Sequence, residues 1–254
     1  MVGLVGAGGK AIKASNIGPR QERAIGESVS LAATNQYGVT KNQQLATYVV
    51  LVGQTVASRT SRADQPWVFG VLDTDKVNAF SGPGGYVWIT RGAIAQMQDE
   101  SELAGVLAHE IGHVVKQHGL DMARSAGLKD AFNEGVNSVG SAAKFSEATD
   151  KVSEGVLETG FSQPQEFEAD AAGVQYLIAA GYDPNGFLRF LQRISAQQKS
   201  GGNVFSTHPG MDDRIKKIAN QISSSGAGGT GATLKDRFMQ YTGKTTVGSI
   251  DVTP

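Results

Sequence analysis

The sequence contains no cysteine, and this absence excludes several kinds of site at once. Without thiols the chain cannot form disulfides, bind zinc through thiolates or use a cysteine nucleophile. Long apolar runs are also missing, since the longest, residues 48–57 (YVVLVGQTVA), is far shorter than the roughly 20 residues that span a bilayer. Residues 1–9 are apolar but lack the basic segment of a signal peptide. We therefore expect a soluble chain, compatible with earlier removal of a targeting segment.

Neither sign of charge is in excess. Lys and Arg total 23 against 24 Asp and Glu, which gives a net charge of -1, and the basic residues are scattered along the chain. This pattern offers no basic surface for nucleic acid and no acidic tail for a basic partner. With 254 residues, 40% of them hydrophobic and 19% charged, the chain has the composition of a globular protein with one sizeable core.

Hydrophobic periodicity predicts a mostly helical chain with a short β region. Strands are expected at residues 67–75 and 86–92, joined through a turn region that contains SGPGG. Helices are expected at residues 19–38, 41–60, 93–119, 164–181, 184–198 and 211–222, with Gly119 ending the third of them. Residues 120–160 have few large apolar side chains, so we expect either a mobile lid or a peripheral helical hairpin there.

The pattern indicates an α+β fold with one main domain. Residues 1–19, rich in Gly and Ala, are expected to form an N-terminal arm, and residues 20–222 the folded domain. Residues 223–232 (SSSGAGGTGA) have the composition of a flexible linker, and they lead into a C-terminal tail that ends at residue 254.

Three of the four histidines lie in one expected helix, within residues 102–119 (ELAGVLAHEIGHVVKQHG). Residues four apart share a helix face, so His109 and His113 can direct two imidazole nitrogens at one point. Glu110 lies beside them, where its carboxylate could take a proton from a metal-activated water. The spacing H-E-x-x-H within an apolar helix predicts a catalytic zinc site with His109 and His113 as two ligands.

A third ligand must come from another element. The segment EFEAD places Glu166 and Asp170 four residues apart, so that Glu166 can ligate zinc while Asp170 accepts an N–H from a ligating histidine. Glu168 lies about 200° around the helix and faces elsewhere. His208 is an alternative ligand. Spacing alone also allows EFEAD to be an acidic first turn that only complements the helix dipole.

Four blocks in this order resemble the HtpX/BepA/CAAX-prenyl-protease group of gluzincin metallopeptidases, in particular its soluble BepA-like branch. The blocks are VLDTDKVNAFSGPGGYVWITRGAI, ESELAGVLAHEIGHV, EFEADAAGVQYLIAAGYDP and FSTHPGMDDRI, between about residues 22 and 220. The resemblance implies a zincin-like core with a small sheet whose edge strand borders the active-site cleft. It further implies one zinc ion held by His109, His113 and Glu166, with Glu110 as general base and Asp170 behind the ligands.

The same resemblance gives the stretch NAFSGPGG a role beside the cleft. An extended peptide substrate could add to a sheet edge there by main-chain hydrogen bonds. On this interpretation Tyr86–Thr90 is the edge strand, and the expected substrate-binding residues are Asn78, Ala79, Phe80, Tyr86, Val87 and Trp88. The alternative is a plain hairpin with a Pro-Gly-Gly turn.

The resemblance also assigns His208, the position of Arg214 four residues beyond Gly210 on the next helix makes it a further candidate, and one histidine is set aside. His208 is expected to point at the zinc, where it either stabilises the oxyanion or occupies the open coordination position and keeps the enzyme latent. Arg214 is expected to orient the site or bind the transition state. His118 is expected to be a solvated histidine at a helix end that complements the dipole.

Together these features predict a zinc-dependent endopeptidase that acts on polypeptides in envelope protein quality control. The resemblance implies a periplasmic or envelope-associated location in a bacterium, with association to a membrane or envelope complex. The alternative is a zinc-containing, largely latent chaperone or assembly factor of the envelope. A purely structural zinc site is disfavoured because such sites are usually closed by four ligands and rich in cysteine.

Overall fold

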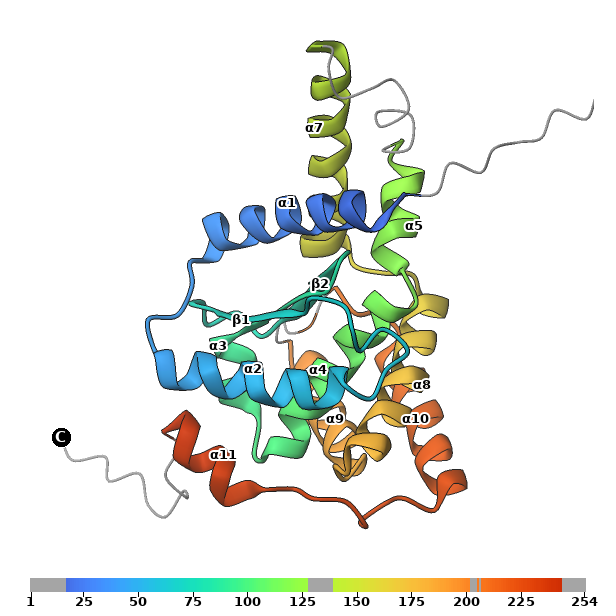
Figure 1. Ribbon diagram of the computed structural model, residues 1–254. Helices are drawn as coiled ribbons and strands as arrows, with labels where there is room; N and C mark the ends of the chain where they lie inside the picture. The colour runs from blue at the N-terminus through green and yellow to red at the C-terminus, as the bar shows by residue number, and fades with distance from the viewer. Residues whose placement is uncertain (1–16, 128–138, 202–204, 206, 244–254) are drawn as a thin grey trace, which may run out of the picture.

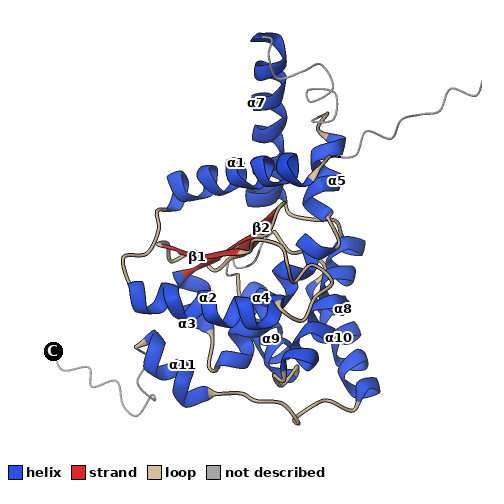
Figure 2. Ribbon diagram, viewed as in Figure 1, coloured by secondary structure: helices blue, strands red, loops and turns tan. Residues whose placement is uncertain are grey.

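A three-stranded sheet lies between two groups of helices in the computed structural model, which describes residues 17–127, 139–201, 205 and 207–243 (Figure 1). The strands are β1 (Val68–Leu72), β2 (Ala79–Gly82) and β3 (Tyr86–Thr90). The helices are α1 (Pro19–Tyr37), α2 (Gln43–Ala57), α3 (Arg91–Gln96), α4 (Glu100–Val115), α5 (His118–Ser125), α7 (Val139–Glu154), the π-helix η1 (Gly155–Thr159), α8 (Gln163–Ala180), α9 (Asn185–Lys199), α10 (Met211–Ser225) and α11 (Lys235–Thr242). The expected mostly helical α+β fold is confirmed (Figure 2).

Each face of the sheet packs against its own core. Phe80 and Trp88 point to the face covered by α1, where they join Ile25 and Val29 with residues of α5 and α7. Val87 and its neighbours on the other face join the larger core built from α2, α4, α8 and α9. Alternation of side chains along each strand produces this division, because successive residues point to opposite faces.

Local signals in the sequence set the ends of the helices that matter most. Asp99 caps α4 by accepting a hydrogen bond from the backbone N–H of Glu102, and Ser162 with Gln165 forms the capping box of α8. Gly181 ends α8 in the left-handed conformation, which glycine adopts without strain. The expected bounds of α8, residues 164–181, are confirmed to within one residue, whereas the helix that contains α4 is an exception.

The exception is the helix expected to run from 93 to 119. It is divided into α3, α4 and α5, and α4 ends at Val115. Gln117 has a φ of 64°, a left-handed conformation that turns the chain before α5 begins at His118. Gly119 was expected to end the helix, but this is wrong, since Gly119 lies inside α5 and packs closely on the ring of Pro83.

The sheet order is β1-β3-β2, with β3 parallel to β1 and antiparallel to β2. The expectation that Tyr86–Thr90 is the edge strand is therefore wrong, because β3 is the central strand and β1 and β2 form the two edges. Sequence reasoning missed β2 because it is only four residues long and its composition, AFSG, is weak for a strand.

The segment that follows α10 differs from the expected flexible linker. Ala232 pairs with Tyr182, Ser101 donates its backbone N–H to Thr233, and the side chain of Phe238 on α11 is fully buried. Arg237 forms an ion pair with Glu100, the first residue of α4. Contacts at Ala232, Thr233, Arg237 and Phe238 thus attach this segment to the body of the protein, although most of its other residues are exposed. The domain boundaries at 19 and 222 stay a prediction.

The segment from 120 to 160 is described only in part. The C-terminal half of α7 buries Ala148 and Val152 against α1 and α5, and α7 extends away from the rest of the fold (Figure 1). Residues 128–138 of this segment, residues 1–16 of the expected arm and residues 244–254 of the tail lie outside the described residues. Among the helices that are described, none combines the length and apolarity needed to cross a membrane.

Candidate metal centre

Close packing of α4 on α8 brings the predicted ligands together. Two glycines remove the side chains that would keep the helices apart: a Cβ on Gly112 would lie 2.8 Å from the carbonyl oxygen of Ala169, and one on Gly173 would lie 3.1 Å from the backbone nitrogen of His109. The two backbones therefore touch beside the H-E-x-x-H motif. His109 and His113 face Glu166 across this contact.

The ligating atoms of these three residues form a compact group. The Nε2 atoms of His109 and His113 are 3.1 Å apart, and the oxygens of Glu166 lie 3.3 Å from His113 Nε2 and 3.5 Å from His109 Nε2. A tetrahedral zinc ion with ligands about 2.0–2.1 Å away separates them by roughly 3.3 Å. Two imidazoles and a carboxylate at these spacings, all buried, fit a zinc ion.

His208 joins the same group from the loop between α9 and α10. Its Nδ1 lies 3.4 Å from His109 Nε2 and 3.1 Å from Glu166 Oε2, so four ligand atoms lie within 4.8 Å of one another. Its Nε2 donates toward the carbonyl oxygen of Ala79 on β2, at 3.2 Å. The structure thus places His208 within the candidate ligand group.

Asp170 and Arg214 lie directly behind the ligands. Asp170 Oδ1 is 2.9 Å from His109 Nδ1, which directs the other ring nitrogen of His109 into the group. Arg214 is buried and forms two hydrogen bonds to Asp170, of 2.8 and 2.7 Å, and an ion pair of 2.6 Å to Glu166. Arg214 therefore orders both carboxylates and neutralises part of their charge.

The expectation for His118 is wrong. It was expected to be solvated, but it is only 3% exposed and its Nδ1 lies 2.8 Å from His113 Nδ1. The turn at Gln117 folds α5 back, so that His118 supports His113 as Asp170 supports His109. The outer nitrogen of His118 approaches Glu168 at 3.5 Å. Sequence spacing could not reveal this contact because the helix is broken between the two histidines.

Glu110 also has a partner that sequence reasoning missed. Its Oε2 accepts a hydrogen bond of 2.9 Å from the hydroxyl of Ser81 on β2, and both residues are buried. Its Oε1 has no hydrogen-bond partner among the described residues and lies 3.6 Å from His208 Nε2. A carboxylate oxygen left open beside three imidazoles can accept a proton from a bound water.

Electrostatics favour a cation in this group. Burial raises the pKa of Glu166, but the charges of His208 and Arg214 outweigh it and hold that pKa far below its usual range. Burial likewise raises the pKa of Asp170, but the charge of Arg214 outweighs it and lowers that pKa to about 2. Burial lowers the pKa of His113. Both carboxylates are therefore anionic and His113 neutral at pH 7, which suits Glu166 and His113 to bind a cation.

His109 is the exception among these groups. Burial and the charge of Arg214 lower its pKa, but hydrogen bonds to Asp170 and Glu166 outweigh them and raise it to about 9. The imidazole must lose this proton before its nitrogen can bind a metal ion. A metal ion that bound here at neutral pH would displace this proton.

The six expected substrate-binding residues are divided by the sheet. Asn78 and Ala79 lie at the start of the edge strand, beside Thr207 and His208. Phe80 belongs to the edge strand, but its side chain is buried on the face away from Glu110. Tyr86, Val87 and Trp88 lie on the central strand, whose two edges are already paired, so the reason for assigning them to substrate binding is lost.

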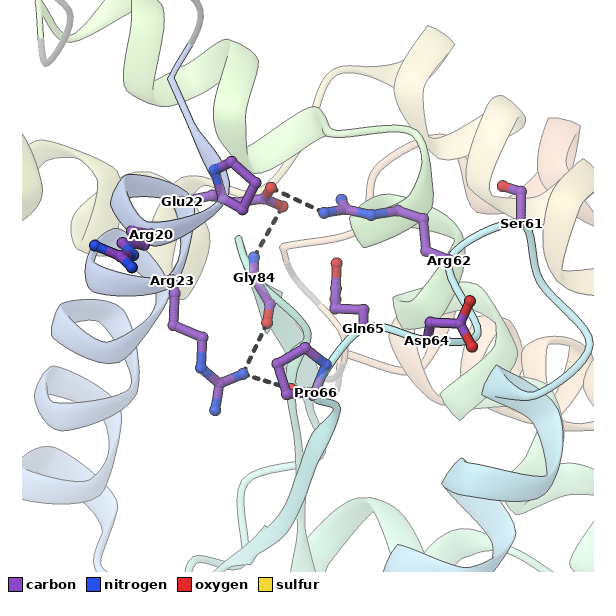
Figure 3. Close-up of a pocket in the computed structure, with 10 residues that line it drawn as sticks. Arg20, Glu22, Arg23, Ser61, Arg62, Asp64, Gln65, Pro66 and Gly84 are labelled. Atoms are coloured by element: carbon purple, nitrogen blue, oxygen red, sulfur yellow. Dashed lines mark hydrogen bonds and ion pairs between the residues drawn. The ribbon is translucent and has the colours of Figure 1, made fainter.

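A hollow of about 580 Å³ lies apart from the metal centre, between the start of α1, the loop after α2 and the turn that joins β2 to β3 (Figure 3). Arg23 donates to the carbonyl oxygens of Pro66 and Gly84, and Glu22 pairs with Arg62 and accepts from the Gly84 N–H. None of the four metal-centre residues lines this hollow. These contacts join the three segments and bear no resemblance to a catalytic group.

Comparison with known proteins places these features in a family. The sequence model of Peptidase family M48 matches residues 43–222. The chain is 28% identical over 217 residues to the beta-barrel assembly-enhancing protease of Yersinia pestis, covering 80% of this chain and 44% of that protein. It is 31% identical over 179 residues to the mitochondrial metalloendopeptidase OMA1 of Schizosaccharomyces pombe, covering 67% of this chain and 51% of OMA1.

The metalloprotease LoiP of Escherichia coli is 23% identical over 230 residues, which cover 88% of this chain and 89% of LoiP. The chain thus spans less than half of the Yersinia assembly-enhancing protease but most of LoiP. The family match contains β1 to β3, the H-E-x-x-H helix, α8 and most of α10, which together build the metal centre. The resemblance expected from the sequence is confirmed, and the chain belongs to Peptidase family M48.

Proposed function

We propose that the protein is a zinc-dependent endopeptidase. The observation that carries this proposal is the convergence of two imidazoles and one carboxylate, from α4 and α8, beside the open oxygen of Glu110. Bound at His109, His113 and Glu166, zinc supplies a Lewis acid that polarises a carbonyl and acidifies water. Family membership supports this function, because named proteases are among the relatives.

Glu110 serves as the general base in this proposal. Its Oε1 has no other hydrogen-bond partner among the described residues, so it is available to take a proton from the attacking water and deliver it to the leaving amine. Asp170 and His118 each hold the far nitrogen of one ligating histidine, and Arg214 holds Glu166 and Asp170 in place. These residues keep the donor atoms directed inward before the cation binds.

The substrate class we propose is extended polypeptide. Strand β2 is a sheet edge that passes directly over α4, and main-chain groups on such an edge can pair with a peptide of any sequence. Ala79 and Asn78 lie where this pairing would begin. A site that binds the main chain of a peptide rather than its side chains suits an enzyme of broad specificity, as quality control requires.

We further propose that His208 keeps the enzyme latent in this conformation. Its Nδ1 stands at ligand-to-ligand distance from both His109 and Glu166, so it would compete with water for a zinc ion held by His109, His113 and Glu166. Its Nε2 meanwhile holds Ala79 O, an outward acceptor of the edge strand. Movement of His208 would free both positions at once.

The setting we propose is the bacterial envelope, in the periplasm or bound to an envelope complex, with unfolded polypeptides as substrates. The support is the likeness to proteins named beta-barrel assembly-enhancing protease. The alternative of a latent assembly factor without protease activity is not favoured, because the described residues retain both the ligand group and an open general base.

Substitution of Glu110 by Gln tests the proposed reaction. Zinc content, measured by atomic emission, should stay near one ion per chain, while cleavage of unfolded casein should be abolished. Wild-type cleavage should stop on chelation and return with added zinc. Glu27→Gln, an exposed substitution on α1, is the matched control and should cleave normally. A Glu110→Gln protein that still cleaves casein in a zinc-dependent manner would show that the base is misassigned.

A further inference from the structure

The side chain that contacts the proposed base comes from the sheet edge. Ser81 is 2% exposed, and its hydroxyl donates a hydrogen bond of 2.9 Å to Oε2 of Glu110, which is fully buried. A hydrogen bond to a buried carboxylate is charge-assisted, and it is stronger than a bond between neutral groups. The contact joins β2 to α4 across 29 residues of sequence.

The position of Ser81 in β2 also determines where its main-chain groups point. The backbone N–H of Thr90 donates to Asn78 O at 3.0 Å, so this pair is hydrogen-bonded across the sheet. In an antiparallel pair such residues alternate with ones whose main-chain groups point outward, which here are Ala79 and Ser81. The contact from His208 to Ala79 O lies on this outer side. Ser81 therefore directs its main-chain groups to the outer side of β2, which is buried in this conformation, and its hydroxyl to Glu110.

The two oxygens of Glu110 are unequal because of this contact. Oε2 is held by Ser81, whereas Oε1 is buried without a hydrogen-bond partner in the described part of the chain and faces His208. Without the hydroxyl, the carboxylate could rotate about its last side-chain bond, a torsion with broad minima. The hydrogen bond selects the orientation in which one oxygen stays free beside the metal centre.

We propose that Ser81 is a positioning residue that fixes the carboxylate of Glu110 and aligns it with the strand that the substrate joins. This inference rests on the proposed function, in which Glu110 is the base. Because Ser81 lies on β2 and its hydroxyl contacts the base, a peptide that pairs with β2 would be held in register with the oxygen that receives the proton. Alignment of this kind lowers the barrier of the chemical step more than it strengthens substrate binding.

Ser81→Ala in the zinc-loaded protein tests the proposal by steady-state kinetics on a quenched peptide. We expect kcat to fall by about ten- to hundredfold, from loss of a hydrogen bond to a charged group, with KM changed less than about twofold. Zinc content and thermal unfolding confirm that the variant is loaded and folded. Ser30→Ala is the matched control, since its buried hydroxyl bonds Trp88 on the opposite face of the same sheet. That variant should keep the wild-type kcat.

A second measurement does not depend on turnover. A peptide hydroxamate binds zinc and gives its N–OH proton to the catalytic carboxylate, so its affinity reports the position of Glu110. Ser81→Ala should weaken hydroxamate binding about tenfold in the wild-type background and have no effect beside Glu110→Gln. Equal effects in both backgrounds, or a kcat within twofold of wild type, would overturn the proposal. If neither the wild-type protein nor the His208→Ala variant cleaves the peptide, the proposed function fails, while this cycle still decides the role of Ser81.

Discussion

Replacing Arg214 by Met should destabilise the metal-free protein more than the zinc-loaded protein. The guanidinium is 1% exposed and contacts two buried carboxylates, with an ion pair of 2.6 Å to Glu166 and hydrogen bonds of 2.8 and 2.7 Å to Asp170. Removing one partner of a buried ion pair costs about 3–5 kcal/mol, because the remaining charge stays buried without compensation. Methionine fills much of the same volume, so the loss comes mainly from charge.

Zinc should offset part of this loss. A bound cation neutralises Glu166 directly, which leaves Asp170 as the carboxylate that depends most on Arg214, and Asp170 keeps His109 as a partner. We expect Arg214→Met to lower the free energy of unfolding by about 3–5 kcal/mol in chelator, and by about half as much in saturating zinc. Since domains are stable by only about 5–15 kcal/mol, the metal-free variant should lie close to unfolding.

Equilibrium urea unfolding, followed by far-UV circular dichroism with chelator and with excess zinc, gives both values. Arg59→Met, an exposed arginine at the end of α2, is the control and should change stability by less than about 0.5 kcal/mol. The reasoning is refuted if Arg214→Met loses less than about 1 kcal/mol in chelator, or if zinc leaves the loss unchanged.

Three further results are expected. His208→Ala should raise the initial rate of casein cleavage by on the order of tenfold, because it enlarges the competent fraction, whereas a lower kcat would indicate an oxyanion role instead. His118→Ala should raise the zinc dissociation constant about 10–100-fold through loss of support to His113, as measured by competition with a chelating dye. Burial raises the pKa of Glu100, but bonds from Arg237 and two tyrosines outweigh it, so the folded pKa lies below 4.5. This carboxylate therefore stabilises the fold above about pH 4.5 and loses that contribution as pH falls further. Urea midpoints between pH 3 and 7 should show the decline, and Arg237→Ala should flatten it.

The sequence could predict the parts of the site that depend on spacing within one helix. His109 and His113 share a face because four residues make about one turn, and Glu166 and Asp170 do so for the same reason. The caps at Asp99 and Ser162 are equally local. Convergence of the two helices could be expected only from the family resemblance, since nothing in either segment alone specifies the other as its neighbour.

The parts that sequence reasoning missed depend on contacts between distant segments. The edge strand was assigned to Tyr86–Thr90 because β2 is short and lacks β-branched residues, while its status as the edge is set by the parallel pairing of β3 with β1. His118 was assigned to solvent because the turn at Gln117 interrupts the helical period. The segment after α10 has the composition of a linker, yet its packing depends on Glu100 and Tyr182, far earlier in the chain.

The glycine contacts between α4 and α8 have a consequence for how the metal centre arises. Because Gly112 and Gly173 let main chain rest on main chain, the separation of the ligand-bearing helices is determined by atoms that every residue possesses. The spacing of the proposed ligand atoms is thus set by the main-chain packing of the two helices as the chain folds, before any cation binds. A side chain at either position would push the two helices apart and change the spacing on which the proposed zinc site depends.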